Sequence, residues 1–245
     1  QKFKQLEQLK KQTLPTAFPL RSIDKVSIPM AGASEEVEVT TGITVTVPVT
    51  RMYAKLKVKV EMRKAEMELN NVNVRQIPNI CRVETLAGDG KGEPMEPVPF
   101  PDETTFSSIA FAASDLEKNE DKEWAVFYVP ENLQGETQTQ GGNKSDAAPS
   151  NALVVDITTE IGGERYLYAA YPGGNSLNNF NIQRNQVYRI TVTITGEKNQ
   201  NNPSANCFVV KPDGFLSFEP YYRVETGGGY NFADYLSPHD ENLKI

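Results

Sequence analysis

Residues able to carry out chemistry are sparse in this chain of 245 residues. Its one histidine, His239, lies among polar residues beside Asp240 and Glu241, and no nucleophile motif lies near it. The two cysteines, Cys81 and Cys207, do not have the spacing of a metal site, and zinc needs several His or Cys ligands. The sequence therefore predicts no catalytic residue, no metal site and no enzymatic activity.

Three polar segments match ligand-binding loops only in part. Residues 88–92 (GDGKG) and 227–229 (GGG) lack the glycine spacing and the following helix of a phosphate loop. Residues 115–121 are acidic, but they lack the central glycine and the ligand order of a calcium loop. We interpret all three as solvated turns, so no cofactor is expected and the ligand-binding residues stay unknown.

Composition excludes further classes of function. The net charge of −7 repels a phosphate backbone, so nucleic acid is not an expected partner. No stretch approaches the roughly 18 uninterrupted apolar residues of a membrane-spanning helix. With 38% hydrophobic and 23% charged residues, the chain has the composition of a folded domain. Because it begins at Gln1, we expect any signal or lipid anchor to lie upstream.

The two cysteines allow two interpretations. Cys81 and Cys207 are far apart in sequence and could form one long-range disulfide, or both could be buried free thiols in separate packing units. We favour two buried thiols, and the cysteine count leaves the redox compartment undecided.

The clearest structural signal is a period of two that begins at residue 43. Residues 43–49 place Ile and Val on odd numbers, with Pro48 indicating an edge strand or a bulge. Residues 52–62 place the apolar residues on even numbers and read as a half-buried strand. A strand cannot change parity without an extra residue, so a bulge or corner is expected near Thr50–Arg51. The row Lys55, Lys57 and Lys59 reads as a solvated face that protects an edge.

The remaining segments favour an all-β protein built of β-sandwiches, with a short N-terminal helix over residues 1–12. Turn residues at 161–164 predict a hairpin between two of the strands, and residues 134–151 read as a mobile surface loop. Further strands are expected at 72–78, 124–129, 153–157, 165–171, 188–194, 207–211 and 215–218.

Linker-like segments suggest how the chain divides. Residues 87–103 are rich in Gly, Pro and acidic residues, and residues 197–206 are polar. We therefore predict an N-terminal domain over 1–100, incomplete at its start, a second sandwich over 101–200, and the start of a further domain or an extension over 201–245.

Three segments resemble the fimbrillin superfamily, the subunits of Bacteroidales-type (type V) pili. The first, Ile28–Gly32 followed by Val49–Leu56, is similar to the family's PM-x-G and R-M-x-A-K stretch. The second, Phe127–Asn132, is similar to its Y-x-x-E-N strand end, and the third, Asn181–Gly196, to its R-N-x-x-Y stretch and the long strand that follows. The matching residues are Pro29, Met30, Gly32, Arg51, Met52, Ala54, Lys55, Pro130, Glu131, Asn132, Arg184, Asn185 and Tyr188.

The resemblance implies an all-β fold of two transthyretin-like (Greek-key) β-sandwich domains. It further implies export to the cell surface and outer membrane, lipid anchoring of a precursor, removal of an N-terminal strand, and assembly with other pilus subunits by strand donation. It also implies that a host or bacterial surface ligand is a partner. The chain departs from the family pattern in two places. A helix and a proline-rich connector precede the first segment, where the family has several strands, and residues 203–245 do not resemble the family's terminal strand. These departures indicate a fragment of an accessory or tip-type subunit.

A second hypothesis is a carbohydrate-binding or adhesive β-sandwich module outside any fibre. It depends on seven aromatic residues between Phe215 and Tyr235, whose rings could stack on sugars. The alternative interpretation of these rings is the core of an incomplete domain, because aromatic side chains dominate cores. An extracellular hydrolase has no motif to support it. The adhesive target, the donated strand and the place of the subunit in a fibre cannot be read from the sequence.

Overall fold

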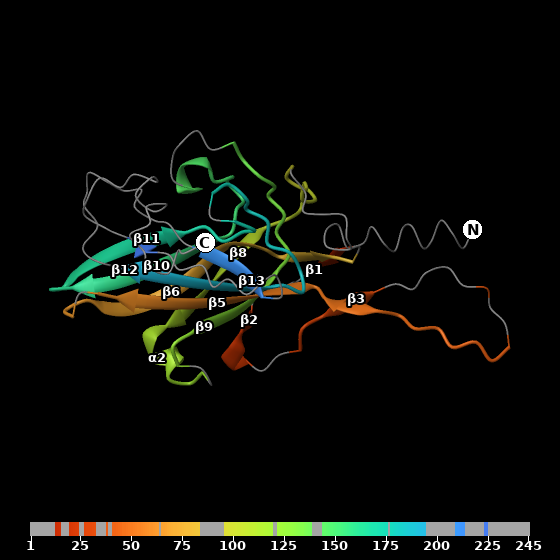
Figure 1. Ribbon diagram of the computed structural model, residues 1–245, viewed down its shortest axis with the longest axis horizontal. Coiled ribbons are helices and arrows are strands. Elements are labelled where there is room, and N and C mark those ends of the chain that lie inside the picture. Colours follow the sequence, from red (N-terminus) through yellow and green to blue (C-terminus); the bar gives the residue numbers. More distant parts are fainter. Residues whose placement is uncertain are drawn as a thin grey trace, which may run out of the picture.

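Figure 1 presents a computed structural model of the chain, in which most of the ordered elements are strands. The expected all-β class is therefore confirmed. The expected helix over 1–12, Cys207, the strand over 215–218 and the aromatic residues 215–235 lie outside the residues that the structure describes. The described residues are 13–15, 20–24, 27–32, 38, 41–63, 65–83, 96–119, 122–138, 144–175, 177–194, 209–213 and 223–224.

The larger sheet is built around the strand that the sequence marks most clearly. This central strand, β5, has a parallel neighbour, β12, on one side and an antiparallel neighbour, β9, on the other. On its other edge β12 pairs with β13 and β14, and β9 pairs with β2. The bounds are β2 (Leu20–Arg21), β5 (Tyr53–Met62), β9 (Ala125–Pro130), β12 (Val187–Ile194), β13 (Val209–Asp213) and β14 (Arg223–Val224).

The smaller sheet has the order β11-β10-β6-β8, with all neighbours antiparallel. Gly162 and Gly163 join β10 to β11 with φ values of 58° and 87°. Two successive left-handed residues form the tight turn that matches strand twist, so the predicted hairpin is confirmed. The bounds are β6 (Glu68–Pro78), β8 (Phe106–Ala112), β10 (Val154–Ile161) and β11 (Glu164–Ala170).

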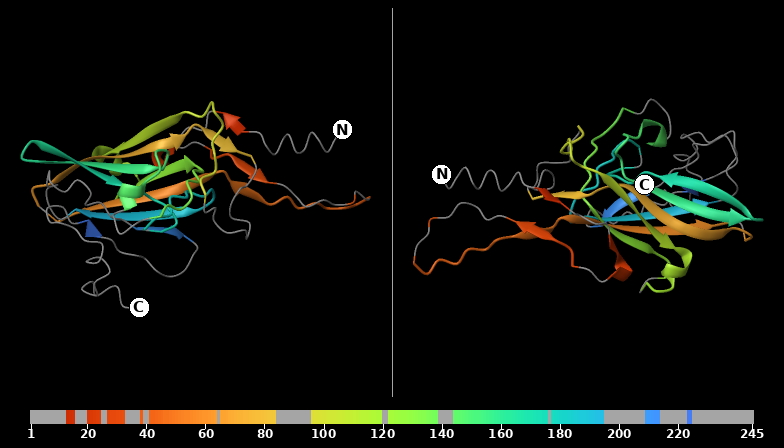
Figure 2. Two further views of the ribbon diagram at one scale, coloured as in Figure 1. Left: turned by 90° about the horizontal axis from the view of Figure 1, so that it is seen from above. Right: turned by 180° about the vertical axis from the view of Figure 1, so that it is seen from behind.

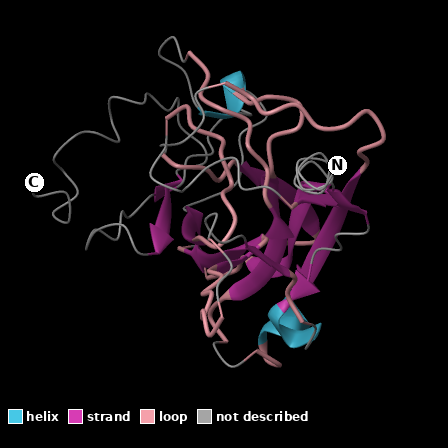
Figure 3. Ribbon diagram, turned by 90° about the vertical axis from the view of Figure 1, so that its right-hand side faces the viewer, coloured by secondary structure: helices cyan, strands magenta, loops and turns pink. Residues whose placement is uncertain are grey.

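The two sheets pack face to face (Figure 3), and buried side chains from both sheets form the core between them. Alternate residues of β5, such as Leu56 and Val58, point into this core, as do Val155 and Ile157 of β10. Phe111 of β8 and Phe127 of β9 meet edge to face across the sandwich, with ring centroids 5.7 Å apart. The core therefore fixes the two sheets relative to each other.

Short elements surround the sandwich. Two additional strand pairs, β1 with β7 and β3 with β4, form separate two-stranded sheets. Their bounds are β1 (Thr13–Pro15), β3 (Met30–Gly32), β4 (Val49–Arg51) and β7 (Ile80–Arg82), and the helical turns are η1 (Ser22–Asp24), α2 (Ala113–Leu116) and η2 (Lys144–Ala147).

The order of the strands in the sheets does not follow the predicted division of the chain into two domains at residue 100. In the larger sheet β5 lies between β9 and β12, and in the smaller sheet β6 lies between β8 and β10, so strands from 1–100 and 101–200 alternate in both sheets. The described part of these two ranges forms one sandwich. A segment rich in Gly and Pro marks a connection between strands, but it does not tell whether the next strand starts a new core. Beyond residue 200, β13 and β14 extend the same sheet.

Candidate interaction surface at one end of the sandwich

A narrow arm projects from one end of the sandwich. Residues 30–32 and 41–51, here called the projecting arm, run away from the two sheets, and β3 pairs with β4 near its base (Figure 1). The arm extends in the direction opposite to the β10–β11 hairpin in both views of Figure 2. It therefore offers a surface well separated from the core.

The projecting arm carries most of the exposed apolar side chains. Within the described residues seven large hydrophobic side chains are exposed, and five of them lie on the arm. Apolar surface concentrated in this way usually marks a site of association. The predicted edge strand over 43–49 is regular only from Val49 on, and residues 43–48 are extended but belong to no strand. The five are Met30 (52%), Ile43 (42%), Val45 (42%), Val47 (48%) and Val49 (53%).

The base of the arm depends on a close approach between two backbones. A Cβ placed on Gly32 would lie 1.9 Å from the carbonyl oxygen of Pro48, so only glycine fits there. Next to this contact the Met52 N–H donates to the Pro29 carbonyl at 3.0 Å. The chain turns at Met52, between β4 and β5, one residue after the corner predicted at Thr50–Arg51.

A buried ion pair lies behind the base of the arm. Arg184 Nη2 lies 2.9 Å from Glu131 Oε2, and each side chain is only 3% exposed. Arg184 also donates from its backbone N–H and Nε to Glu131 Oε1, at 3.3 and 3.2 Å, and from Nη1 to the Val83 carbonyl at 3.4 Å. These additional hydrogen bonds offset the cost of removing two charges from water. The pair joins the end of β9 to the turn before β12.

Asn185 connects this pair to the arm. Its backbone has a φ of 60°, a left-handed conformation that asparagine tolerates better than most residues. The Asn185 N–H donates to the Tyr53 carbonyl at 2.8 Å, and its Oδ1 accepts from Arg51 Nη1 at 3.3 Å. Arg51 ends β4 and Tyr53 begins β5, so this asparagine holds the corner from which the arm leaves the sandwich.

Asn132 and Tyr188 hold neighbouring loops at the same end. The Asn132 side chain donates to the carbonyls of Gln76 and Asn151 at 3.2 and 2.8 Å, and its backbone exchanges hydrogen bonds with Ile182. The Tyr188 hydroxyl accepts from the Gln183 N–H at 2.8 Å and donates to the Asn181 carbonyl at 3.3 Å. Buried polar groups that are satisfied in this way keep connecting loops rigid.

The three segments singled out in the sequence therefore converge at one end of the sandwich. Pro130 pairs with Tyr53 in the sheet, and Ala54 beside it is fully buried. Lys55 is half-buried, and its ammonium lies 5.9 Å from the centre of the Tyr128 ring. The prediction that Lys55, Lys57 and Lys59 protect an edge is wrong, because their strand β5 lies between β9 and β12. The spacing of these residues gave no sign that Glu131 and Arg184, 53 positions apart, would pair.

Sequence reasoning missed a buried lysine in this loop region. Lys144 is 3% exposed and donates to the carbonyls of Asn175 and Asn179 at 2.7 and 2.6 Å. Its ammonium also lies 4.8 Å from the centre of the Phe180 ring. Gln134 is buried as well, so the prediction that residues 134–151 are a surface loop is wrong for these positions. A polar composition alone did not reveal that the loop packs inward.

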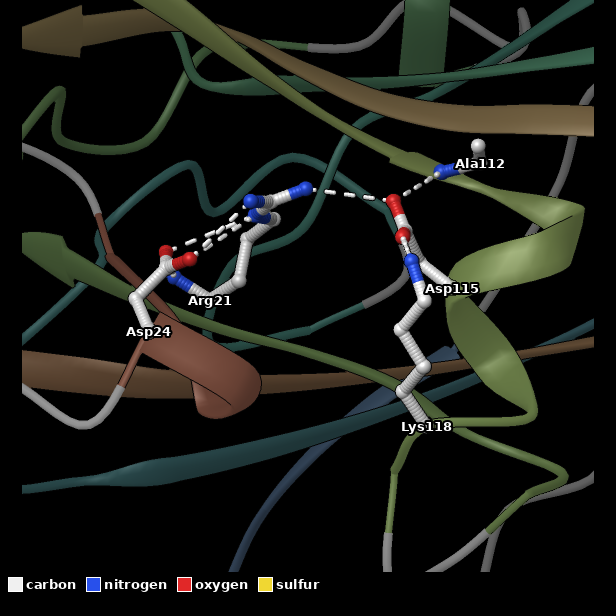
Figure 4. A network of polar contacts seen from close by, with 5 residues as sticks. All are labelled: Arg21, Asp24, Ala112, Asp115 and Lys118. Carbon is white, nitrogen blue, oxygen red and sulfur yellow. Dashed lines mark hydrogen bonds and ion pairs between the residues drawn. The ribbon is translucent and has the colours of Figure 1, made fainter.

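A second charge network joins β2 to α2 on the side of the sandwich (Figure 4). Arg21 pairs with Asp24 at 3.0 Å and with Asp115 at 3.1 Å, and Asp115 also pairs with Lys118 at 2.7 Å. The hydrogen bond from Lys118 is the largest cause that lowers the pKa of Asp115 below its ordinary value of 3.8. Burial opposes ionisation of Asp24, but the hydrogen bonds from Arg21 outweigh it and lower its pKa.

Cys81 is a buried free thiol, in agreement with the interpretation we favoured for it. It packs with Met52 and Tyr53 in a small cluster at the base of the arm. Burial raises the pKa of Cys81 to about 12, and burial also raises that of the Tyr53 hydroxyl. Neither group is therefore prepared to act as a nucleophile at neutral pH.

The helical segments of the described residues are all too short and too polar to cross a bilayer. In the same part of the chain, no three His, Cys, Asp or Glu side chains gather closely enough to hold a metal ion.

Comparisons with known proteins give one family and several solved structures. A family described as a domain of unknown function (DUF4906) matches residues 127–192, a stretch that contains both Glu131 and Arg184. No curated protein matches the sequence.

The chain is similar to the tip fimbrial protein Mfa3 from Porphyromonas gingivalis with a C-terminal truncation, at 15% identity and a TM-score of 0.48, over 86% of this chain and 71% of that one. It is also similar to a candidate cell adhesion protein from Bacteroides eggerthii, at 14% identity and a TM-score of 0.44, over 86% and 72%. These two solved proteins are described as a tip fimbrial protein and a cell adhesion protein.

Proposed function

We propose that this protein is a structural and adhesive subunit of a bacterial surface pilus, which joins neighbouring subunits by β-strand donation and has no enzymatic activity. The observation that carries the proposal is the projecting arm, where Ile43, Val45, Val47 and Val49 are exposed on a rigid, well-packed sandwich. Such a concentration of aliphatic surface favours association with another protein.

The construction of this end of the molecule supports the same function. Glu131 and Arg184, both buried, and Asn185 hold the corner from which the arm leaves the sandwich. These residues belong to the segments that resemble fimbrillins. A subunit of a fibre must transmit force through its points of contact, and a base with buried, hydrogen-bonded charges resists local opening better than a flexible loop does.

The proposal places the protein at the cell surface, exported and attached to the outer membrane or to a pilus. Its proposed partners are other pilus subunits and a ligand on a host or bacterial surface. We favour an accessory or tip-type position over the stalk, because the sequence of residues 203–245 does not resemble the family's terminal strand.

Assembly of the purified protein tests this function. A pilus subunit should form oligomers that survive detergent at room temperature and dissociate on heating, because strand addition buries main-chain hydrogen bonds. An isolated adhesive module should stay monomeric and be retained on a glycan column. A protein that remains monomeric at high concentration, both alone and mixed with other pilus subunits of the same bacterium, contradicts the proposal.

A further inference from the structure

We propose that residues 43–49 of the projecting arm are the donated strand and that they add to the free edge of β8 in a second copy of this chain. The inference rests on the proposed function, and it names the two segments that strand donation would join. It follows from the side-chain pattern of the arm and from the charge pattern of the sheet edges.

The arm has the side-chain pattern of a donated strand. Ile43, Val45, Val47 and Val49 alternate with Thr44, Thr46 and Pro48, so an extended chain presents aliphatic side chains on one face and small, mostly polar ones on the other. No charged residue occurs between Thr41 and Thr50. A segment of this kind is suited to a partner that offers free main-chain groups beside an apolar strip.

The edge strands of the two sheets differ in how they are protected. Exposed edges normally carry charges or proline, which prevent unwanted pairing. Arg21 in β2 and Arg165 in β11 provide such charges, and the sequences of β13 and β14 each include a basic residue. In contrast, β8 (FSSIAFA) contains neither a charge nor a proline. Among the described edges of the two sheets, β8 is the one left unprotected.

Residues 43–49 and β8 also match in length and in the arrangement of their apolar and polar faces. Residues 43–49 and the strand β8 each span seven residues. On β8, Phe111 is buried and Ile109 packs against the core, while Ser108 and Ala110 are exposed. An added strand would place its aliphatic face beside Ile109 and Phe111, over the margin of the core. Its threonine face would continue the exposed face of Ser108 and Ala110.

Pro48 is compatible with this arrangement. A proline cannot donate a hydrogen bond to a sheet, so it is tolerated at an edge where its nitrogen faces away from the neighbour. Residues on one strand edge alternate between facing the partner and facing away from it. In one of the two possible orientations of the added strand, the main chain of Pro48 faces solvent. The main-chain groups of Val47 and Val49 then face β8 and form the hydrogen bonds to it.

Cysteine cross-linking between separately purified variants tests the pairing. Thr46→Cys is mixed with Ser108→Cys or with Ala110→Cys, all in a Cys207→Ala background, since opposed residues on paired strands come close enough for a disulfide. The matched control is Arg165→Cys on β11, which is exposed on the other edge of the same sheet. We expect a mixed disulfide dimer with at least one β8 position and little with Arg165→Cys. Equal yields at both edges, or none at β8, would overturn the inference.

Charge substitution on the two faces of the arm gives a second test. Val45→Asp would place a charge in the apolar interface and should raise the concentration needed for self-association by at least about tenfold. Thr46→Asp, next to it on the opposite face, should leave that concentration nearly unchanged. Both variants should unfold at the temperature of the wild type because the arm lies outside the core. Equal self-association of the two variants contradicts the proposal.

The two proposals fail in different ways. If the wild type assembles while Val45→Asp assembles equally well and β8 does not cross-link, the pilus function stands and the arm is not the donated strand. If the wild type stays monomeric in every mixture, both proposals are wrong.

Discussion

Arg184 and Glu131 form a buried ion pair that connects the turn before β12 to the end of β9, with Nη2 and Oε2 2.9 Å apart. The same arginine reaches the Val83 carbonyl, and its neighbour Asn185 bonds to Arg51 and to the Tyr53 main chain. The pair is thus the inner support of the corner from which the projecting arm leaves the sandwich.

Removing one partner of this pair should be costly. Arg184→Met leaves the Glu131 carboxylate buried without its partner, and we expect a loss of about 3–5 kcal/mol in the free energy of unfolding. Urea denaturation monitored by fluorescence gives this value. The control is Arg165→Met, because the Arg165–Glu160 pair is 75% and 37% exposed and should contribute only about 0–1 kcal/mol. An equal loss of free energy of unfolding in the two variants would show that the buried pair stabilises the fold no more than an exposed pair does.

A substitution at the base of the arm should act locally. Gly32→Ala places a Cβ against the Pro48 carbonyl, so β3 must separate from β4. We expect faster amide exchange at residues 30–32 and 49–51, with the thermal unfolding of the sandwich almost unchanged. Gly42→Asn is the matched control, because a Cβ there meets no atom within 4 Å and asparagine tolerates its φ of 82°. Exchange at the wild-type rate in Gly32→Ala would contradict the packing described at this position.

The network around Arg21 should make stability depend on pH in the acid range. The pKa values of Asp24 and Asp115 are lower in the folded state than their ordinary value of 3.8. Their contribution is therefore complete above pH 3.8 and is lost as the pH falls through the folded pKa values, because the unfolded chain binds more protons in this range.

Asp115→Asn removes one of these two carboxylates. Its free energy of unfolding should be lower than that of the wild type near neutral pH, and the two curves should converge toward pH 2. Denaturant titrations at a series of pH values measure this difference. Asp102→Asn, which changes an exposed carboxylate in the turn before β8, should follow the wild type throughout. A difference in the free energy of unfolding that stays constant between neutral pH and pH 2 would contradict this prediction.

Cys81 should resist thiol reagents in the native protein. Its side chain is buried and its pKa is raised to about 12, so the reactive thiolate is rare at pH 8. We expect labelling of Cys81 to be slow in buffer and rapid in denaturant, as measured by mass spectrometry of the peptide that contains it. Rapid labelling under native conditions would mean that the cluster with Met52 and Tyr53 opens readily.

Local patterns in the sequence were sufficient to predict many strands but not their partners. The alternation of residues 52–62 and 188–194 predicts β5 and β12, yet their parallel pairing joins segments more than a hundred residues apart. Alternation reveals which face of a strand is buried and carries no information about its neighbour. The predicted boundary at residue 100 failed for the same reason, because turn composition does not show which sheet the next strand joins.

The candidate site was predictable only in part. The resemblance pointed to Gly32, Arg51, Glu131, Arg184 and Asn185 as single positions, and the structure gathers them at one end of the sandwich. The buried role of Lys144 was not foreseeable, because its partners are main-chain carbonyls whose positions depend on the folded loop. Exposure of the arm likewise could not be read from a pattern that fits a half-buried strand equally well.

Hydrogen–deuterium exchange of the arm, measured on the monomer and on the assembled protein, distinguishes a donated strand from an ordinary exposed loop. We expect rapid exchange at residues 43–49 in the monomer, where the aliphatic side chains are exposed, and strong protection of the same residues after assembly. Strong protection of these amides already in the isolated monomer, or rapid exchange that persists after assembly, would contradict this expectation.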